Sequence, residues 1–536
     1  MEKRPINYLY FGFFFSFLAF LASSSIFNKS DLSGSGFFFF LYALGQITLE
    51  IAVFAFLDNL VAKYLGKLCF SLFIGMTFTA LSVHFFDFLM DRVLDLSVWN
   101  ALRIFILDER LENFFYLLDA SGISLSIWLL FFIFLGMLPF IGMILYRLSM
   151  KIVEKKPLYL ESSQLLQAVL FIPLALFLWD FSTSKAIHPD AYTTFTTSLP
   201  WKTTFLKPQK AYFPLPGPLK EPLSEKTVIQ MIQEDETEIL ERPNIYLFIV
   251  ESLRADVINE QITPHLSKFK LESTSFEKGI SGGNGTHLSW FTIFHPQFPF
   301  LWRTIQKKGW EMGSPAINLF KKWGYQVRLY TSAQLGYYGM NELLFGKEGH
   351  LIDVRSEFLH APPLTAAESD REAVQTLMKN IQEKKELQKG QVFIIFLDCT
   401  HFDYNWPENW SPKFTPFAQE FAYFKAFQST KTIRALKNRY QNAVNYMDSL
   451  FGAFYEFLPD KENAIIAFTG DHGEEFFEHG HLFHCSHLTH VQTNVPLYIK
   501  FGNQTPLTKP LGSQMDIFPL ITVSYTHLTL PTNREV

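Results

Sequence analysis

Two apolar segments that end in metal-ligand residues decide the fold of this chain. They are Asn244-Ile-Tyr-Leu-Phe-Ile-Val-Glu251-Ser252 and Ala464-Ile-Ile-Ala-Phe-Thr-Gly-Asp471-His472-Gly473. Short, continuous apolar runs of this kind are typical of strands that are buried on both faces of a parallel sheet. Because the carboxyl ends of such strands meet at one edge, we expect Glu251, Asp471 and His472 to lie close together.

The alternation of strands and helices continues through the second half of the chain. Strands are predicted at 244–250, 326–331, 392–398 and 464–469, and helices at 301–309, 371–385 and 432–458. Strands that alternate with helices form mostly parallel sheets covered on both faces. The sequence therefore predicts an α/β domain with a mostly parallel central sheet.

The first third of the chain is rich in phenylalanine and in long apolar segments. Phenylalanine accounts for 59 of the 536 residues, which points to a lipid environment rather than to a larger soluble core. A membrane-spanning helix needs about 20 apolar residues. Five stretches reach this length, at 8–26, 36–57, 67–90, 123–146 and 164–181. The predicted fold is therefore five transmembrane α-helices followed by the α/β domain.

Basic residues between these helices predict their orientation. Lys3 and Arg4 precede the first helix, two lysines separate the second from the third, and a basic cluster at 147–156 separates the fourth from the fifth. All three groups fall on one side of the membrane if the helices alternate, and basic loops are typically cytoplasmic. We therefore expect a cytoplasmic amino terminus and an α/β domain on the far side. The net charge of −5 gives no reason to expect a nucleic-acid partner.

Three features close to the membrane each allow two interpretations. Glu50, His84 and Asp87 lie inside or near the ends of the helices, where ionisable groups are often functional, although His84 and Asp87 can also reach the interface. Residues 91–119 fit an amphipathic helix on the outer membrane surface, or a loop helix packed on the bundle. Residues 182–225 combine proline, lysine and aromatic residues, so they suit either an arm in the headgroup layer or a plain spacer.

The chain is expected to divide into four segments. They are a transmembrane domain at 1–181, a proline-rich arm or linker at 182–241, the α/β domain at 242–522 and a tail at 523–536. Through Thr532 the tail resembles the translation of a common transposase sequencing adapter. We therefore expect a non-native tail and a truncated α/β domain. A genuine polar tail is the alternative.

A glycine-rich turn between the two deciding segments presents a hydroxyl. It reads Ser281-Gly-Gly-Asn-Gly-Thr286-His287. A carboxylate and an imidazole at one strand end can bind a divalent ion, and Glu251 can complete the ligand set. We predict a one-metal site of Glu251, Thr286, Asp471 and His472, in which the ion activates Thr286 as the nucleophile. The alternative is that Thr286 only caps a helix at 287–294.

Polar residues outside this set are candidates for binding substrate. Asn284 lies in the glycine-rich turn, and Asp398-Cys-Thr-His401 follows a strand, so that His401 can reach a phosphate oxygen. Five histidines follow downstream, at 479, 481, 484, 487 and 490. We select His484 among them, although the spacing of the last four also fits a metal-binding face of one helix.

Acidic and cysteine residues beside the site have plainer expectations. Glu474, Glu475 and Glu478 are expected to be solvated, with a second metal site as the alternative. Cys399 and Cys485 flank predicted site residues, so they are either free thiols or a bridge, whereas Cys69 lies in an apolar run. Three cysteines fit no disulfide framework.

These motifs resemble the alkaline phosphatase and sulfatase superfamily, especially its membrane-anchored branch of lipoteichoic acid synthases and lipid A phosphoethanolamine transferases. The resemblance places Glu251, Thr286, Asp471 and His472 on the metal and nucleophile positions. The segment Thr286-His-Leu-Ser289 lacks the Cys/Ser-x-Pro-x-Arg pattern that matures to formylglycine in true sulfatases. Hydrolysis of sulfate esters is therefore not expected.

Within that branch the chain is most similar to the YejM/PbgA-type inner-membrane proteins. The similar segments are Ile262-Thr-Pro-His-Leu-Ser-Lys-Phe269, Phe396-Leu-Asp-Cys-Thr-His401, Arg439-Tyr-Gln-Asn-Ala-Val-Asn-Tyr-Met-Asp448 and His484-Cys-Ser-His…Gln492-Thr-Asn-Val-Pro-Leu497. Those proteins carry five amino-terminal helices, an arm and a sulfatase-like domain, and they are associated with lipopolysaccharide homeostasis. The resemblance implies a multi-pass protein of the bacterial inner membrane with a periplasmic domain.

Two functions from different classes follow. In the first, Thr286 attacks a phospholipid headgroup phosphodiester with the help of one divalent ion (Zn, Mn or Mg), and the group passes to water, a lipid or a glycan. In the second, the protein is a lipid-sensing regulator with little or no catalysis, since fold alone does not imply function. We favour the enzyme because its ligand set is complete. The expected partners are membrane phospholipid, lipid A or lipopolysaccharide, and a candidate membrane protein.

Overall fold

The computed structural model divides into two compact units, Met1–Pro218 and Leu219–Val536. It describes residues 4–27, 34–94, 125–183, 223–237, 241–359, 364–384, 389–419, 430–485 and 488–529, with isolated residues at 97, 98, 187, 195, 198–201, 204, 239 and 387. The expected amphipathic segment at 91–119 lies almost entirely outside the described residues. So do most of the expected arm at 182–241, His487 and residues 530–536.

The first unit is a bundle of long apolar helices. They are α1 (Tyr8–Phe27), α2 (Gly34–Tyr64), α3 (Lys67–Leu94), α6 (Leu125–Val153) and α7 (Ser162–Thr183). Among the described residues, these five helices are long and apolar enough to cross a membrane. Every predicted span coincides with one of them, and this confirms the prediction of five membrane helices.

Glycines allow the helices of the bundle to approach closely. A Cβ on Gly142 of α6 would lie 2.2 Å from Phe78 Cβ of α3, and one on Gly45 of α2 would lie 2.5 Å from Leu176 Cδ2 of α7. Small residues at such contacts favour helix packing in lipid, where van der Waals contact drives association.

The second unit contains a nine-stranded sheet with the order β11-β2-β10-β6-β1-β5-β3-β4, and β9 pairs with β2. The five strands from β6 to β4 are parallel. Antiparallel pairs join β10 to β6 and β2, and β9 to β2. The strands are β1 (Ile245–Val250), β2 (Thr274–Ile280), β3 (Gln326–Thr331), β4 (Val354–Glu357), β5 (Gln391–Leu397), β6 (Ile465–Gly470), β9 (Asn494–Val495), β10 (Leu497–Phe501) and β11 (Thr508–Ser513).

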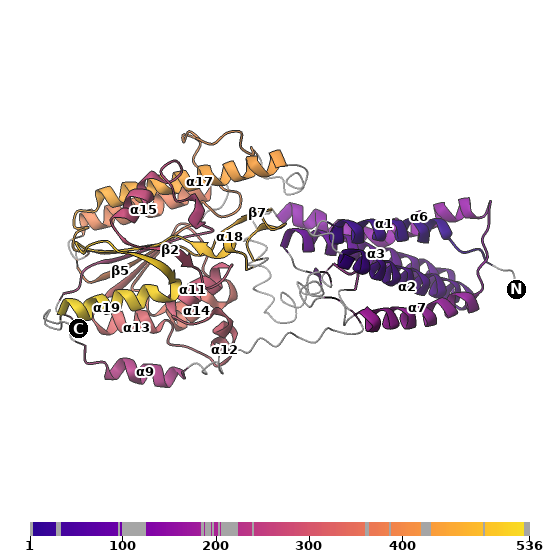
Figure 1. Cartoon of the computed structure of the whole chain (residues 1–536), viewed down its shortest axis with the longest axis horizontal. Helices are drawn as coiled ribbons and strands as arrows, with labels where there is room; N and C mark the ends of the chain where they lie inside the picture. Colours follow the sequence, from indigo (N-terminus) through magenta and orange to yellow (C-terminus); the bar gives the residue numbers. More distant parts are fainter. Residues whose placement is uncertain are drawn as a thin grey trace. The chain divides into compact units, whose positions relative to one another are not determined.

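Helices cover both faces of this sheet. Figure 1 shows α15 (Ala366–Glu383) and α17 (Thr430–Phe457) on one face, and α11 (Thr286–Phe294), α13 (Pro315–Lys322), α14 (Met340–Phe345) and α19 (Ile517–Thr529) on the other. All residues of β1, β5 and β6 are buried, as expected for parallel strands between two helical layers. The prediction of an α/β domain with a mostly parallel sheet is therefore confirmed.

Shorter elements complete the second unit. The helices are α9 (Glu225–Glu234), α10 (Pro264–Leu271), α12 (Trp302–Lys307) and α18 (His490–Thr493), and β7 (Glu475–Phe476) pairs with β8 (Leu482–Phe483) in a separate hairpin. Helix α9 lies within the range expected as an arm, and α19 continues past residue 522, the expected end of the α/β domain.

Candidate metal centre

Three carboxylates lie side by side at the carboxyl edge of the sheet. Val250, the last residue of β1, is in register with Leu397 of β5 and Gly470 of β6. The next residues along the three strands are Glu251, Asp398 and Asp471, and all three are buried. The predicted meeting of Glu251 and Asp471 is therefore observed. Asp398, which the sequence analysis used only to locate His401, is a third member of the group.

His472 joins this group of carboxylates. Its Nε2 lies 3.1 Å from Glu251 Oε1 and 3.5 Å from Asp471 Oδ2. Ligand atoms of Glu251, Asp471 and His472 all lie within 4.8 Å of one another, close enough to hold one metal ion. His472 Nδ1 lies 3.0 Å from the carbonyl of Gly473, which can only accept a hydrogen bond. In the neutral ring Nδ1 therefore carries the proton, and Nε2 is the atom available to a metal.

Thr286 presents its hydroxyl to the same group. It is the first residue of α11, after the N-cap residue Gly285. Its Oγ1 lies 3.2 Å from Glu251 Oε2 and 3.5 Å from His472 Nε2. The alternative role of helix cap is not observed, because Gly285 occupies that position. The amino terminus of α11 carries partial positive charge, which favours an anion beside Thr286.

The glycines before Thr286 are required by close packing. A Cβ on Gly282 would lie 1.9 Å from Thr292 Oγ1, and one on Gly283 would lie 2.8 Å from Leu288 Cβ. The turn therefore lies directly against α11, and its glycines fix where the helix begins. This contact explains why the glycine-rich segment is needed to hold the Thr286 hydroxyl in place.

The electrostatics of the group favour a bound cation. Burial raises the pKa of Asp398 and of Asp471 well above the usual range, and the charge of Glu251 raises both further. Burial would also raise the pKa of Glu251, but attraction to His472 and two further histidines holds it well below its usual range. In His472, burial lowers the pKa, yet Asp471 and Glu251 outweigh burial and raise it to about 10. The three buried carboxyl groups therefore outnumber the one imidazolium, His472, that contacts them, and a bound cation would supply the missing positive charge.

The two carboxylate oxygens of Asp471 have different surroundings, and one of them is available to a metal ion. Asp471 Oδ1 accepts the backbone N–H groups of Ser252, at 2.9 Å, and of His472, at 2.7 Å. Asp471 Oδ2 is buried and, apart from the His472 ring 3.5 Å away, has no hydrogen-bond partner among the residues that the structure describes. A buried polar atom without a partner is costly, and a divalent cation held by oxygen and imidazole ligands would satisfy it. The donor set of Glu251, Thr286, Asp471 and His472 thus fits the predicted metal.

The predicted substrate residues His401 and His484 lie next to this centre. The rings of His472 and His484 are 4.3 Å apart, and those of His401 and His484 are 5.5 Å apart. Both histidines also gather with Glu251 as a second group able to hold a metal. His484 Nδ1 lies 3.3 Å from Glu474 Oε1, so this buried carboxylate fixes the ring.

Asn284 is held by a chain of hydrogen bonds from the other side of the site. Its Nδ2 donates to Gln492 Oε1 at 2.9 Å, and Gln492 Nε2 donates to Glu475 Oε2 at 2.9 Å. Glu475 also accepts the backbone N–H groups of His479 and His481. The carboxylate therefore ties together the loop that carries the histidines.

The structure corrects the expectations for the downstream glutamates. Glu474 and Glu475 are fully buried rather than solvated, because they bind His484 and the loop backbone. Glu478 is an ion-pair partner of Arg254, at 2.7 Å. The three were expected to be surface residues, since adjacent glutamates among histidines are typical of a solvated loop, and nothing local in the sequence reveals their partners.

The described histidines of this cluster do not form the single helix face that was the alternative to one functional histidine. His481 precedes β8, His484 follows it, and of the described members only His490 lies in a helix, at the start of α18. The hairpin β7–β8 turns through Gly480, whose φ is +92°, and this interrupts helical spacing. Cys399 and Cys485 are free thiols rather than a bridge, and so is Cys69.

A comparison with known families identifies the second unit. The family model described as Sulfatase matches residues 243–522, more than half of the chain. The chain belongs to the sulfatase family. Membership confirms the predicted resemblance to the sulfatase family and supports the prediction of an enzyme. No curated protein sequence matches the chain.

Several solved structures are similar to this chain. Lipooligosaccharide phosphoethanolamine transferase A from Neisseria meningitidis, an integral membrane protein, is 13% identical with a TM-score of 0.54, over 95% of this chain and 94% of that chain. The periplasmic domain of EptC from Escherichia coli, solved with zinc, is 17% identical with a TM-score of 0.42, over 53% and 82%. Lipoteichoic acid synthase LtaP from Listeria monocytogenes is 15% identical with a TM-score of 0.41, over 59% and 80%. The Neisseria structure agrees with the present fold across both units.

Proposed function

We propose that this protein is a metal-dependent phosphotransferase or phosphodiester hydrolase that acts on membrane lipid headgroups, with Thr286 as its nucleophile. The observation that carries the proposal is the placement of the Thr286 hydroxyl, 3.2 Å from Glu251 and 3.5 Å from His472 at the start of α11. The Glu251 carboxylate and the His472 imidazole contact the hydroxyl, and both side chains are buried. A phosphoryl group approaching it meets the positive end of the helix.

Glu251, Thr286, Asp471 and His472 would hold one divalent ion, either Zn, Mn or Mg. When bound, the ion lowers the pKa of the Thr286 hydroxyl and neutralises charge on the phosphoryl oxygens. The buried carboxylates around it stay ionised because the cation compensates them. Asp471 Oδ1 remains fixed by two backbone N–H groups, so the protein presents a rigid ligand rather than one that must reorient.

The chain's own residues then account for the transfer. Thr286 Oγ1 passes its proton to Glu251, whose carboxylate accepts its hydrogen bond, and forms a bond to phosphorus as the bond from phosphorus to the lipid's leaving oxygen breaks. The leaving oxygen takes a proton from the ring of His484, which Glu474 holds at Nδ1. A water or an acceptor hydroxyl next attacks phosphorus and gives its proton to His484, while Glu251 returns its proton to Thr286 as the bond from Thr286 to phosphorus breaks. Asn284 and His401 would bind the phosphoryl oxygens.

The membrane unit supports a lipid substrate, because five helices that could span a membrane would anchor the enzyme in the same bilayer as the lipid. We infer a multi-pass protein of the bacterial inner membrane with a cytoplasmic amino terminus and a periplasmic enzyme domain. The basic residues at 3–4, 63–67 and 147–156 support this orientation.

The proposed segments remain 1–181 for the membrane domain, 182–241 for the arm, 242–522 for the enzyme domain and 523–536 for a non-native tail. Membrane phospholipid and lipid A or lipopolysaccharide are the proposed partners, together with a membrane protein.

Thr286→Ala tests the proposal in the full chain purified in detergent. We expect the turnover of a phospholipid phosphodiester to fall by at least about three orders of magnitude, because the attacking atom is removed. Thr304→Ala, at an exposed position of α12, is the matched control and should keep full turnover. Metal content is measured in each protein.

Equal turnover of Thr286→Ala and the control would reject the nucleophile. Absence of turnover in the metal-loaded wild type, with all tested lipids, would instead favour the lipid-sensing regulator.

A further inference from the structure

Ser252 lies within the metal centre, and its backbone has an uncommon conformation. It directly follows Glu251, it is fully buried, and its φ is +56°. This left-handed region is costly for any residue that carries a Cβ, and glycine is the residue that favours it. Strained backbone at a buried site is commonly associated with function, so the serine side chain at this position calls for a role.

Hydrogen bonds hold both backbone groups of Ser252. Its N–H donates to Asp471 Oδ1 at 2.9 Å, and its carbonyl accepts the hydroxyl of Tyr440, on α17, at 2.8 Å. Tyr440 is fully buried as well, and its oxygen accepts the backbone N–H of Arg254 at 3.0 Å. Ser252 is therefore fixed from two sides, and its strained backbone cannot relax without breaking these bonds.

The conformation directs the Ser252 hydroxyl toward two side chains of the site. Its Oγ donates to Glu251 Oε1 at 3.2 Å and lies 3.4 Å from His484 Nδ1. A hydroxyl has a single proton, so an oxygen that donates to Glu251 can only accept from His484. The Glu474 carboxylate also faces His484 Nδ1, at 3.3 Å. In the neutral ring Nδ1 therefore carries the proton, and Nε2 is the nitrogen that remains for the substrate.

The same hydrogen bond orients the Glu251 carboxylate. Ser252 Oγ and His472 Nε2 both approach Oε1, at 3.2 and 3.1 Å, whereas Thr286 Oγ1 lies nearer to Oε2, at 3.2 Å. The two oxygens of Glu251 thus face different partners. Loss of a hydrogen bond that orients a metal-binding carboxylate typically reduces metal affinity or activity by about 10–100-fold.

We propose that Ser252 is a positioning residue for the transfer, which holds the Glu251 carboxylate toward Thr286 and the His484 ring toward the leaving oxygen. Ser252 has this role only if Glu251 and His484 act as in the proposed function, on which the inference rests. One hydroxyl then links the group that accepts the proton of Thr286 to the group that protonates the leaving oxygen. A glycine would adopt the same backbone without strain, but it has no hydroxyl to hold either partner.

Ser252→Gly and Ser252→Ala, made in the full chain purified in detergent, separate the hydroxyl from the backbone. Ser252→Gly should unfold at a higher temperature than Ser252→Ala, because glycine adopts a positive φ without the steric cost of a Cβ. Both variants should bind zinc about tenfold more weakly, measured by titration against a chelating dye, and at saturating zinc should lose kcat about tenfold on a phospholipid phosphodiester. The KM should change little, because Asn284 and His401 are unaltered.

The leaving group provides a readout that a loss of stability alone would not change. A nitrophenolate leaves without being protonated, whereas the alkoxide of a lipid needs the proton of His484. The loss of kcat in Ser252→Gly should therefore be smaller on a nitrophenyl phosphodiester, about threefold, than on the lipid.

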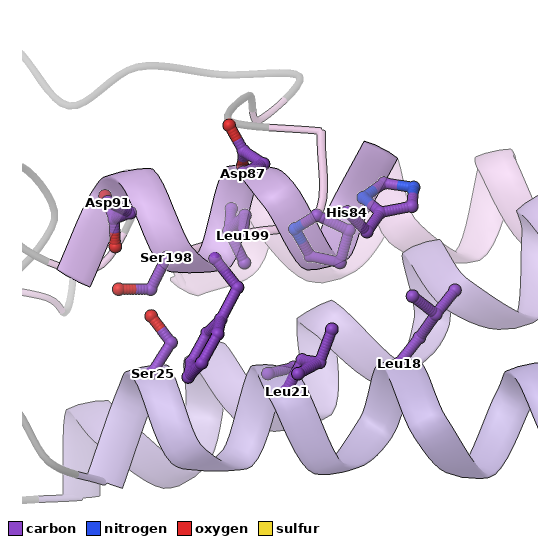
Figure 2. Close-up of a pocket in the computed structure, with 11 residues that line it drawn as sticks. Leu18, Leu21, Ser25, His84, Asp87, Asp91, Ser198 and Leu199 are labelled. Atoms are coloured by element: carbon purple, nitrogen blue, oxygen red, sulfur yellow. The ribbon is translucent and has the colours of Figure 1, made fainter. Parts of the chain in front are cut away.

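Two matched variants separate these effects from general ones. Glu348 is exposed, has a φ of +58° and takes no part in the metal centre, so Glu348→Gly relieves similar backbone strain elsewhere. Ser25 belongs to the membrane unit, where it lines a pocket beside α1 and α3 (Figure 2), and Ser25→Ala removes a serine hydroxyl from that unit. Both variants should keep the kcat, the KM and the zinc affinity of the wild type.

Three outcomes would overturn the role of Ser252 alone, provided that Thr286→Ala is inactive. Ser252→Gly with the kcat and zinc affinity of the wild type would show that the hydroxyl positions nothing. An equal loss of kcat on the lipid and on the nitrophenyl substrate would exclude the link to His484. A loss that lies entirely in KM would place Ser252 in substrate binding. Equal turnover of Thr286→Ala and the wild type would instead overturn the proposed function, and the role of Ser252 with it.

Discussion

Asp471→Asn separates metal binding from folding, because Asp471 uses its two oxygens differently. Oδ1 accepts two backbone N–H groups, and an asparagine carbonyl can keep both bonds. Oδ2 has no hydrogen-bond partner within the described part of the chain, so the substitution breaks no hydrogen bond there. It removes one negative charge and one metal ligand. We therefore expect a folded protein that no longer takes up the ion.

The charges around Asp471 give the size of the effect without metal. The carboxylates of Glu251 and Asp471 present ligand atoms within 4.8 Å, so two ionised groups there repel by at least roughly 3 kcal/mol at an effective dielectric constant near 20. The lost attraction to His472, 3.5 Å away, is of similar size and opposite sign. The free energy of unfolding of the metal-free variant should therefore lie within about 2 kcal/mol of wild type.

The metal supplies the readout. An ion present at a hundred times its dissociation constant stabilises the wild type by about 2.7 kcal/mol. For a unit of this size that corresponds to a rise in Tm of roughly 4 °C. The thermal transition is followed by tryptophan fluorescence with metal and with chelator, beside the exposed control Glu456→Gln on α17. A metal-dependent rise of wild-type size in Asp471→Asn would refute the assignment of Asp471 as a ligand.

Two carboxylates beside the site give further predictions. Glu475→Gln replaces an acceptor of four hydrogen bonds, so chemical denaturation should show a free energy of unfolding lower by about 2 kcal/mol. The KM should also rise, because Asn284 loses the support of the Gln492–Glu475 hydrogen bond. An unchanged KM would contradict the positioning role of Glu475. For Glu478, burial would raise the pKa, but Arg254 outweighs it and lowers the pKa from 4.5 to about 2. Its stabilisation is therefore complete above about pH 4.5 and is lost as the pH falls toward 2. Glu478→Gln should cost about 1 kcal/mol at pH 7, discounted for solvent screening, and should flatten the stability profile between pH 5 and 2, whereas a profile as steep as wild type would show that another group controls it.

The sequence predicted the centre of the sheet but not its edges. Strands β1, β3, β5 and β6 are continuous apolar runs, because both of their faces are buried. Strand β2 reads Thr-Ser-Phe-Glu-Lys-Gly-Ile and β11 reads Thr-Lys-Pro-Leu-Gly-Ser, and both expose much of their length. Such segments lack the pattern of a buried strand, so only the pairing seen in the structure identifies them.

The meeting of the proposed ligands was predictable where they follow buried strands. Glu251, Asp471 and His472 could be placed because register brings parallel strand ends together, and Thr286 because glycines precede it. Glu474 and Glu475 could not, since their burial depends on His484 and on backbone groups of a loop whose path the sequence does not encode locally. Asp398 is intermediate, because it follows a strand as Glu251 does and the same signal would have placed it in the group, although it served only to locate His401.

The division of the proposed metal ligands between the ends of β1 and β6 has a consequence for biosynthesis. Glu251 emerges from the ribosome long before Asp471 and His472, and the two ends become neighbours only when β6 joins the sheet beside β1. Under the proposed assignment, an incomplete chain cannot capture the ion, and metallation follows folding rather than guiding it. The protein would then bind its ion in the compartment in which the domain folds. A low metal concentration there would leave the protein folded but inactive.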